Sequence, residues 1–243
     1  MRTRVPCYAP CTLRRRHKQT HGGLQRAGSF VIPDPVDVLL PEALGEFGVD
    51  RRELRLELRL VHVFRDVHAL GAQLRDRAAL VVVDVQEAFR PYEAFAAVAD
   101  SARKLLQAAR ILDLPRVVSE QYPKGLGHTA PEVGLEGEPL LEKTVFSAAR
   151  ADRFNLSGRE QAIVCGIETH VCVSQTVHDL LEKGLEVHVP ADAVGSRHRV
   201  DYERGLERME RAGAVVTTVE AALFELLGRA GTPEFKAVQQ LIL

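Results

Sequence analysis

The stretch Ala79–Gln86, with the sequence ALVVVDVQ, decides the fold of this chain. Its first five residues are a continuous apolar run, which is typical of a strand that is covered on both faces. Asp84 follows this run directly, and a charge beside a buried strand is costly unless it caps a turn or takes part in chemistry. The stretch therefore predicts a central strand with a polar group at its carboxyl end.

Apolar runs and helix-like stretches alternate from this strand to residue 227. We expect further strands over residues 116–118, 162–165, 185–189 and 214–217, and helices over 95–112, 171–183, 200–212 and 219–227. This alternation with short connections predicts an α/β fold, a doubly wound, mostly parallel sheet with helices on both faces. Such sheets bind ligands in the crevice outside the carboxyl ends of their strands.

The composition excludes several classes of protein. The chain has 243 residues, a formal net charge of −1 and four cysteines. A near-neutral chain gives no argument for binding nucleic acid, and no apolar run reaches the roughly 18–20 residues of a membrane span. Few cysteines and no secretory signal favour a reducing compartment. We therefore expect a cytoplasmic protein that acts on a small-molecule substrate, with no nucleic-acid or membrane partner.

The chain divides into three parts. Residues 1–33 are rich in arginine and contain no acidic residue, so we predict a disordered tail, with a targeting segment or a misplaced start site as alternatives. Residues 34–77 are an N-terminal extension of unassigned role, in which residues 54–60 alternate as an edge strand does. Residues 78–243 carry the alternating strands and helices and form the main domain.

A cysteine stands where a strand passes into a helix. Cys172 lies in the first helical turn after the strand of residues 162–165, and the dipole of a helix start favours a thiolate. A small buried apolar residue is the alternative for Cys172, and it is the interpretation we adopt for Cys165. Asp84 has the alternative of a loop cap. By pattern alone, Lys143 is an ordinary surface lysine.

Six segments contain the residues discussed above or flank them, and their order along the chain forms a recognisable pattern. They are LVVVDVQEAF (80–89), SEQYPKGLGH (119–128), EKTVFS (142–147), CGIETHVCV (165–173), ADAVGS (191–196) and GTPEFK (231–236). With them, residues 78–240 resemble the isochorismatase-like cysteine hydrolase superfamily, and within it the small hydrolases related to the vertebrate isochorismatase-domain proteins. The resemblance implies a doubly wound parallel sheet, which agrees with the alternation above, and makes residues 78–243 a hydrolase domain.

The resemblance also implies a set of site residues. It maps a catalytic triad onto Asp84, Lys143 and Cys172, in which the thiolate attacks, the carboxyl group moves protons and the lysine favours the thiolate. It places the oxyanion-binding N–H groups at Glu168 and Cys172, and a cis peptide bond between Ile167 and Glu168. The expected activity is hydrolysis of an amide or carbamoyl-type C–N bond through a thioester.

Three departures from related enzymes narrow this expectation. Residues 119–122 lack the Asp-x-His metal motif of nicotinamidases and His128 alone is insufficient, so we predict no metal. Isochorismatases that cleave a vinyl ether often lack the cysteine, so Cys172 favours acyl chemistry. Ala148 and Ala149 stand where close relatives often have a second cysteine, which leaves the substrate open.

The remaining expectations concern the surroundings of the triad. No glycine-rich phosphate loop is present, so we expect no nucleotide cofactor. Resemblance implies a homo-oligomer. Vinyl ether hydrolysis, a catalytically idle scaffold or interaction protein and redox sensing through Cys172 remain alternatives, although Cys165 is a poor resolving partner. Gln86, Phe89 and Tyr122 line the pocket or pack beside it, with equal weight, and the same holds for Glu120 and His170 near the crevice mouth. Phe146, beside the lysine, is a candidate for seating a planar substrate, but we favour a core role for it.

Overall fold

The computed structural model describes residues 75–243 of the chain. The expectations for residues 1–33, and for the edge strand at residues 54–60, lie outside the described residues. Within residues 75–243, no helix is both long enough and apolar enough to cross a membrane.

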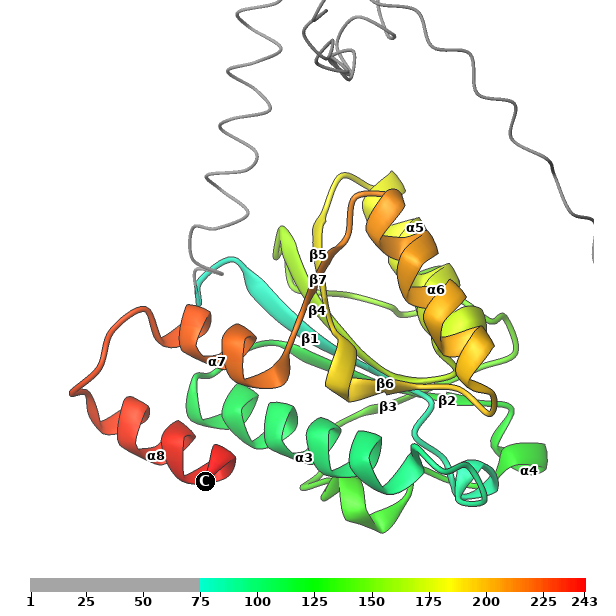
Figure 1. Ribbon diagram of the computed structural model, residues 1–243, viewed down its shortest axis with the longest axis horizontal. Helices are drawn as coiled ribbons and strands as arrows, with labels where there is room; N and C mark the ends of the chain where they lie inside the picture. The colour runs from blue at the N-terminus through cyan, green and yellow to red at the C-terminus, as the bar shows by residue number, and fades with distance from the viewer. Residues whose placement is uncertain (1–74) are drawn as a thin grey trace, which may run out of the picture. The chain divides into compact units, whose positions relative to one another are not determined.

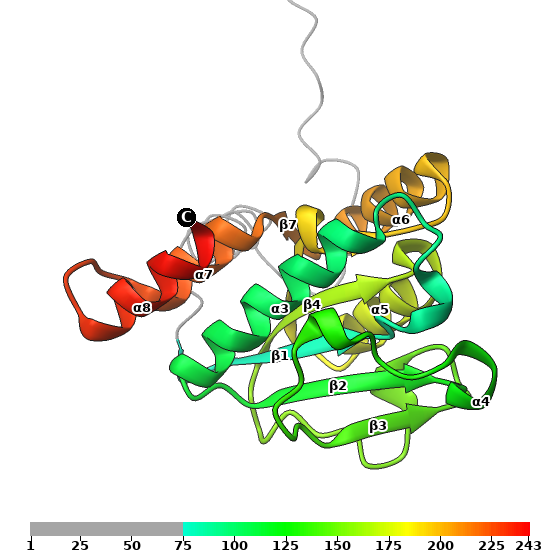
Figure 2. The same cartoon turned by 90° about the horizontal axis from the view of Figure 1, so that it is seen from below.

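A seven-stranded sheet forms the centre of the described region (Figures 1 and 2). All of its strand pairs are parallel, in the order β3-β2-β1-β4-β5-β7, with β6 paired to β4. The doubly wound parallel sheet predicted from the sequence is thus confirmed. The strands are β1 (Ala78–Val83), β2 (Arg116–Gln121), β3 (Leu140–Lys143), β4 (Gln161–Ile167), β5 (Glu186–Pro190), β6 (Val194–Gly195) and β7 (Val215–Thr217).

Helices cover both faces of the sheet (Figures 1 and 2). The helix α3 lies on one face with α7 and α8, and α5 and α6 lie on the other. The helices are α3 (Phe95–Ile111), α4 (Pro123–Leu126), α5 (Ser174–Glu182), α6 (Arg199–Arg211), α7 (Val219–Leu227) and α8 (Pro233–Ile242). Short turns are η2 (Glu87–Phe89), η3 (Pro131–Val133), η4 (Ala148–Arg150), η6 (Ala191–Ala193) and the π-helical η5 (Thr169–Val173).

The alternating side chains of β1 reach two separate hydrophobic cores. Leu80 and Val82 pack in the core under α3, whereas Val81 and Val83 pack in the core under α5. Every residue of β1 is buried, which explains why its sequence is apolar throughout and not alternating. Burying an aliphatic side chain of this kind contributes roughly 1.5–3 kcal/mol, so β1 anchors both layers of helices.

The structure adds elements that the pattern of apolar residues did not predict. These are the strands β3 and β6 and the helices α4 and α8. The start of α8 has a local signal, because the Thr232 side chain accepts a hydrogen bond from the backbone N–H of Phe235 and Pro233 occupies the first helical position. The helix α7, which the sequence predicted with the same bounds, has a similar cap at Thr218.

The direction of winding reverses between β1 and β4. The chain runs from β1 outward to β2 and β3, and then from β4 outward to β5 and β7. At the carboxyl end of this strand pair, Gly166 pairs with Val83 and has a φ of 128°. A Cβ atom on Gly166 would lie 1.9 Å from the carbonyl oxygen of Val83. Ligand sites in doubly wound sheets lie at this kind of switch point.

Candidate active site

Three strand ends bring the predicted triad residues to the switch point. Asp84 follows β1 in a left-handed conformation, with a φ of 54°. Lys143 is the last residue of β3, and Cys172 lies in η5, the turn that follows β4. All three side chains are buried. Asp84 and Lys143 are 59 positions apart along the chain, and Lys143 and Cys172 are 29 apart. The parallel strands bring all three to the same edge of the sheet.

The carboxylate of Asp84 forms a buried ion pair with Lys143. The Nζ atom of Lys143 donates to Oδ2 of Asp84 at 2.7 Å, and neither side chain is exposed. The hydroxyl of Ser119, at the end of the neighbouring strand β2, donates to Oδ1 of Asp84 at 2.7 Å. A buried charge pair is tolerated only when hydrogen bonds occupy its remaining polar atoms. Asp84 is therefore held as a fixed acceptor and is not a simple loop cap.

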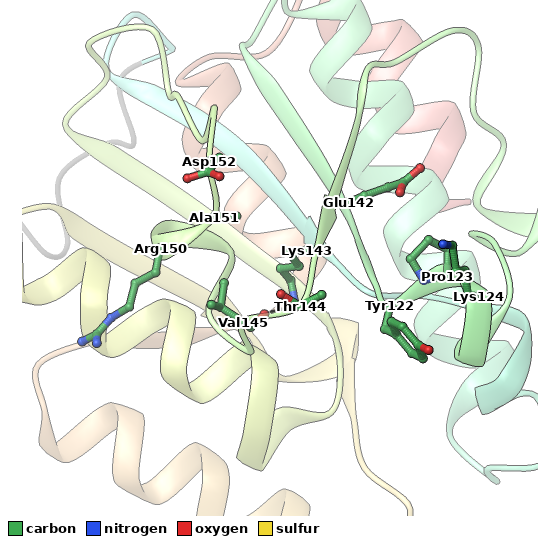
Figure 3. A pocket seen from close by; sticks show the side chains of 10 residues that line it. All are labelled: Tyr122, Pro123, Lys124, Glu142, Lys143, Thr144, Val145, Arg150, Ala151 and Asp152. Atoms are coloured by element: carbon green, nitrogen blue, oxygen red, sulfur yellow. Dashed lines mark hydrogen bonds between the residues drawn. The ribbon is translucent and has the colours of Figure 1, made fainter.

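The ammonium group of Lys143 has acceptors for all three of its protons. Besides Asp84, it donates to Oε1 of Gln121 at 2.7 Å and to the backbone oxygen of Phe146 at 2.9 Å. Figure 3 shows its side chain surrounded by Thr144 and Val145. The pattern-based interpretation of Lys143 as a surface residue is thus wrong. Lys143 is buried because β3 pairs with β2, which places it opposite Gln121.

The thiol of Cys172 lies in an environment that favours its protonated form. Burial raises its pKa from 9.0 to about 12, and the negative charge of Asp84 acts in the same direction, while the charge of Lys143 acts against both. The expectation that the helix start holds a resting thiolate is therefore corrected: desolvation of the sulfur outweighs the cation. The resting group is a thiol with a carboxylate beside it.

Two predicted neighbours of the site support its loops. Gln86 is fully buried; its Nε2 donates to the backbone oxygens of Gln121 and Gly127, and its Oε1 accepts from Gln121 N–H at 2.8 Å. Both polar atoms of its amide are thus hydrogen-bonded to the backbone at the end of β2 and in the loop that follows it. Glu120 accepts from the N–H and hydroxyl of Thr129 and contacts Nδ1 of His128 at 3.1 Å.

The pKa of Glu120 shows how strong these contacts are. Burial alone would raise its pKa, but hydrogen bonds from Thr129 and His128 outweigh burial and lower it. Glu120 is therefore an ionised anchor for the loop at residues 128–129. His170, the other residue expected at the crevice mouth, lies with its Nδ1 3.1 Å from the hydroxyl of Ser196.

The aromatic candidates divide into two groups. Phe89 packs on Tyr92, with ring centroids 5.4 Å apart, against the core under α3. Tyr122 and Phe146 are about half exposed, in the loops after β2 and β3. Tyr122 lines a pocket of about 370 Å³ beside the strand ends, together with the Lys143–Val145 segment (Figure 3). Asp84 and Cys172 do not line this pocket.

Sequence reasoning missed two residues that contact the ion pair, Ser119 and Gln121. Both are buried at the end of β2, beyond the expected limit of that strand at residue 118. Their signal was present, since polar side chains directly after an apolar strand also singled out Asp84.

The structure also has a cis peptide bond between Ile167 and Glu168. No cluster of three or more potential metal ligands occurs within residues 75–243, and metal independence stays a prediction.

The doubly wound sheet, with buried polar groups at its switch point, places the chain in the α/β class of folds. Comparison with known proteins specifies the family. The isochorismatase domain matches residues 78–221, so the chain belongs to the isochorismatase domain family and is an isochorismatase-like hydrolase.

Relatives and a solved structure agree with this assignment. Isochorismatase domain-containing protein 2 of Bos taurus is 42% identical over 177 residues, which cover 72% of this chain and 87% of the relative. Isochorismatase domain-containing protein 1 of Salmo salar is 42% identical over 194 residues, covering 77% and 69%. A structure described as MAR1 ribonuclease from Caenorhabditis elegans is 43% identical, with a TM-score of 0.66, covering 71% of this chain and 92% of that one.

Proposed function

We propose that this hydrolase uses Cys172 to cleave the C–N bond of a small amide or carbamoyl-type substrate through a thioester or thiocarbamate. The observation that carries the proposal is the buried Asp84–Lys143 ion pair at 2.7 Å, next to a thiol at the sheet's switch point. A thiol needs only a nearby base to become a strong nucleophile. The carboxylate of Asp84 is that base, and Lys143 holds it in place through their hydrogen bond.

The first half of the reaction transfers the acyl group to sulfur. Asp84 accepts the proton of the Cys172 thiol while the sulfur attacks the carbonyl carbon, and the carbonyl oxygen becomes an oxyanion. The C–N bond then breaks as the protonated Asp84 gives its proton to the leaving nitrogen. The products are an acyl-enzyme and an amine or ammonia. The backbone N–H groups of Glu168 and Cys172 are the proposed donors to the oxyanion.

The second half returns the enzyme to its starting state. Asp84 takes a proton from water, and the resulting hydroxide attacks the acyl carbon. The C–S bond breaks, and the proton on Asp84 passes to the sulfur of Cys172. A carboxylic or carbamic acid leaves. In both halves Lys143 acts through its charge and through its hydrogen bonds to Asp84, Gln121 and the backbone of Phe146. Its charge stabilises the thiolate during transfer.

The raised pKa of Cys172 sets the timing of this mechanism. A thiol with a pKa of about 12 stays protonated until a carbonyl group is in position to take up the charge. Proton transfer to Asp84 and attack by the sulfur are then coupled. Cys165 faces the opposite core from Cys172, so it cannot serve as a resolving partner.

RNA is a second candidate substrate, because the related Caenorhabditis elegans structure is described as a ribonuclease. Phosphodiester cleavage has no use for a sulfur nucleophile that forms an acyl intermediate. The two candidates are therefore separated by their dependence on Cys172. Vinyl ether hydrolysis and an inactive scaffold are separated in the same way, since neither needs the thiol.

The test is a hydrolysis screen with small amides, ureido acids, carbamoyl compounds and a short RNA, run on the wild type and Cys172→Ala. We expect ammonia or amine release from at least one C–N substrate, and a loss of at least about 10³-fold in Cys172→Ala, because only oxyanion stabilisation remains. The matched control is Cys165→Ala, which removes a thiol from the other core and should retain activity. Full activity of Cys172→Ala would overturn the proposal.

A further inference from the structure

Two segments of the site approach each other away from the ion pair itself. One is η5, which carries Cys172, and the other is the loop of residues 144–148, whose backbone oxygen at Phe146 accepts from Lys143. The proposed reaction needs the sulfur and the ammonium group at a fixed separation. Cys172 lies in the turn after β4, and the loop after β3 accepts a hydrogen bond from Lys143. Contacts between this turn and this loop therefore help to set the separation.

A single buried hydroxyl connects the two segments. The Oγ1 atom of Thr176 in α5 donates to the backbone oxygen of Cys172 at 2.7 Å. The Oγ1 atom of Thr176 in turn accepts a hydrogen bond from the backbone N–H of Ala148 at 2.9 Å. Thr176 is 0% exposed. A threonine hydroxyl in a helix often donates to the backbone carbonyl four residues earlier. The second hydrogen bond, from Ala148 N–H, comes from a different segment and is not explained by the helix.

We infer that Thr176 is a positioning residue that sets the location of Cys172 relative to Lys143. Its hydroxyl has one proton to give and an oxygen to accept with, and both are used here. The inference rests on the proposed function, in which these two residues act together. Thr176 touches no reacting atom; it acts through the Cys172 carbonyl and through the loop that holds the lysine.

Other contacts attach the same loop region to α5, so removing this hydroxyl should not unfold the site. The guanidinium of Arg150 donates to both carboxylate oxygens of Asp179 at 2.8 and 2.6 Å. Lys183 donates to the backbone oxygen of Ala149 at 2.6 Å. These contacts hold the loop against the helix but reach neither Cys172 nor Lys143. The role of Thr176 can therefore be separated from general stability.

The experiment compares Thr176→Val with Thr176→Ser. Valine keeps the shape and removes both hydrogen bonds, whereas serine keeps the hydroxyl and removes a buried methyl group. The rate at which iodoacetamide alkylates Cys172 is followed over a range of pH by mass spectrometry of the peptide that contains it. We expect Thr176→Val to slow alkylation by about 10-fold or more, with a shifted pH profile, since small misplacement of reacting groups is costly. Thr176→Ser should label within about twofold of the wild type, although its Tm falls.

A matched control lies in the same turn as Cys172. Thr169 is also 0% exposed, but its hydroxyl oxygen has no hydrogen-bond partner among residues 75–243. Thr169→Val should therefore leave the alkylation rate unchanged. Wild-type labelling in Thr176→Val, or equal slowing in Thr176→Val and Thr176→Ser, would overturn the inference. Labelling needs no substrate, so this outcome is distinct from activity in Cys172→Ala, which overturns the proposed function.

Discussion

Two cysteines seven residues apart occupy opposite sides of the same sheet. Cys165 points from β4 into the core under α3, and Cys172 lies in the turn after β4, in the core under α5. Burial raises the pKa of both thiols to about 12. For Cys165, burial is the sole cause, whereas Cys172 also has the charges of Asp84 and Lys143 beside it.

Under the proposed function, burial alone does not distinguish the catalytic cysteine from the structural one. Both side chains are nearly inaccessible, and both start as thiols. The difference is a carboxylate that can accept the proton and a cation that compensates the charge that remains. Removal of either charge should therefore lower the reactivity of Cys172 toward that of Cys165. Substitution of Cys165 should change the free energy of unfolding and not the hydrolysis rate.

The largest effect is expected from removing the base. Asp84→Asn keeps the shape of the side chain and loses proton transfer, so hydrolysis should fall by roughly 10²–10⁴-fold. Alkylation of Cys172 should slow toward the rate of Cys165 in the same native protein. Asp100→Asn is the matched control, because Asp100 forms an exposed ion pair with Lys104 on α3, away from the site. A variant at Asp84 that folds and keeps full activity would contradict this comparison.

Removing the cation should cost stability as well as reactivity. In Lys143→Met the buried carboxylate loses its partner, and an uncompensated buried charge typically costs about 3–5 kcal/mol of unfolding free energy. Denaturant unfolding measures this loss. The double variant Asp84→Asn, Lys143→Met should recover part of the stability, because no unpaired charge is left, and none of the activity. A double variant as unstable as the sum of both single variants would show that the two side chains do not act as a pair.

The smallest effect concerns Cys165 and pH. Its pKa is 9.0 when exposed and about 12 when buried, so above pH 9.0 the unfolded chain loses this proton while the folded chain keeps it. The folded state therefore loses stability as pH rises from 9.0 toward 12, by about 1.4 kcal/mol per pH unit for this group. The decline in unfolding free energy should be shallower in Cys165→Ala. Parallel slopes for both proteins would show that Cys165 ionises while folded.

The sheet and its central residues could be predicted because their signals are local. The apolar run before Asp84 predicts a strand that is buried on both faces. The passage from strand to helix made Cys172 a candidate, and the family resemblance assigned it to the predicted triad. The bounds of α7 were visible for the same reason, since its cap and apolar face lie within its own sequence. Each of these features depends on neighbours a few residues away.

The features that could not be predicted depend on pairing between distant segments. The pattern around Lys143 alternates between exposed and buried positions over four residues, too short to identify β3. Its burial follows from its register beside Gln121 and from Asp84, which is 59 residues earlier. The thiol state of Cys172 was missed for a similar reason: a helix dipole can be read from sequence, but the desolvation that outweighs it depends on packing.

Gly166 limits how this family member can change. Its missing side chain lets β4 lie against the carbonyl of Val83, and any Cβ there would meet that oxygen at 1.9 Å. The residue after Val83 is Asp84, and the turn that follows β4 carries Cys172. No side chain can therefore be added at Gly166 unless one of the two strands moves, and such a movement would displace the residues that follow both strand ends.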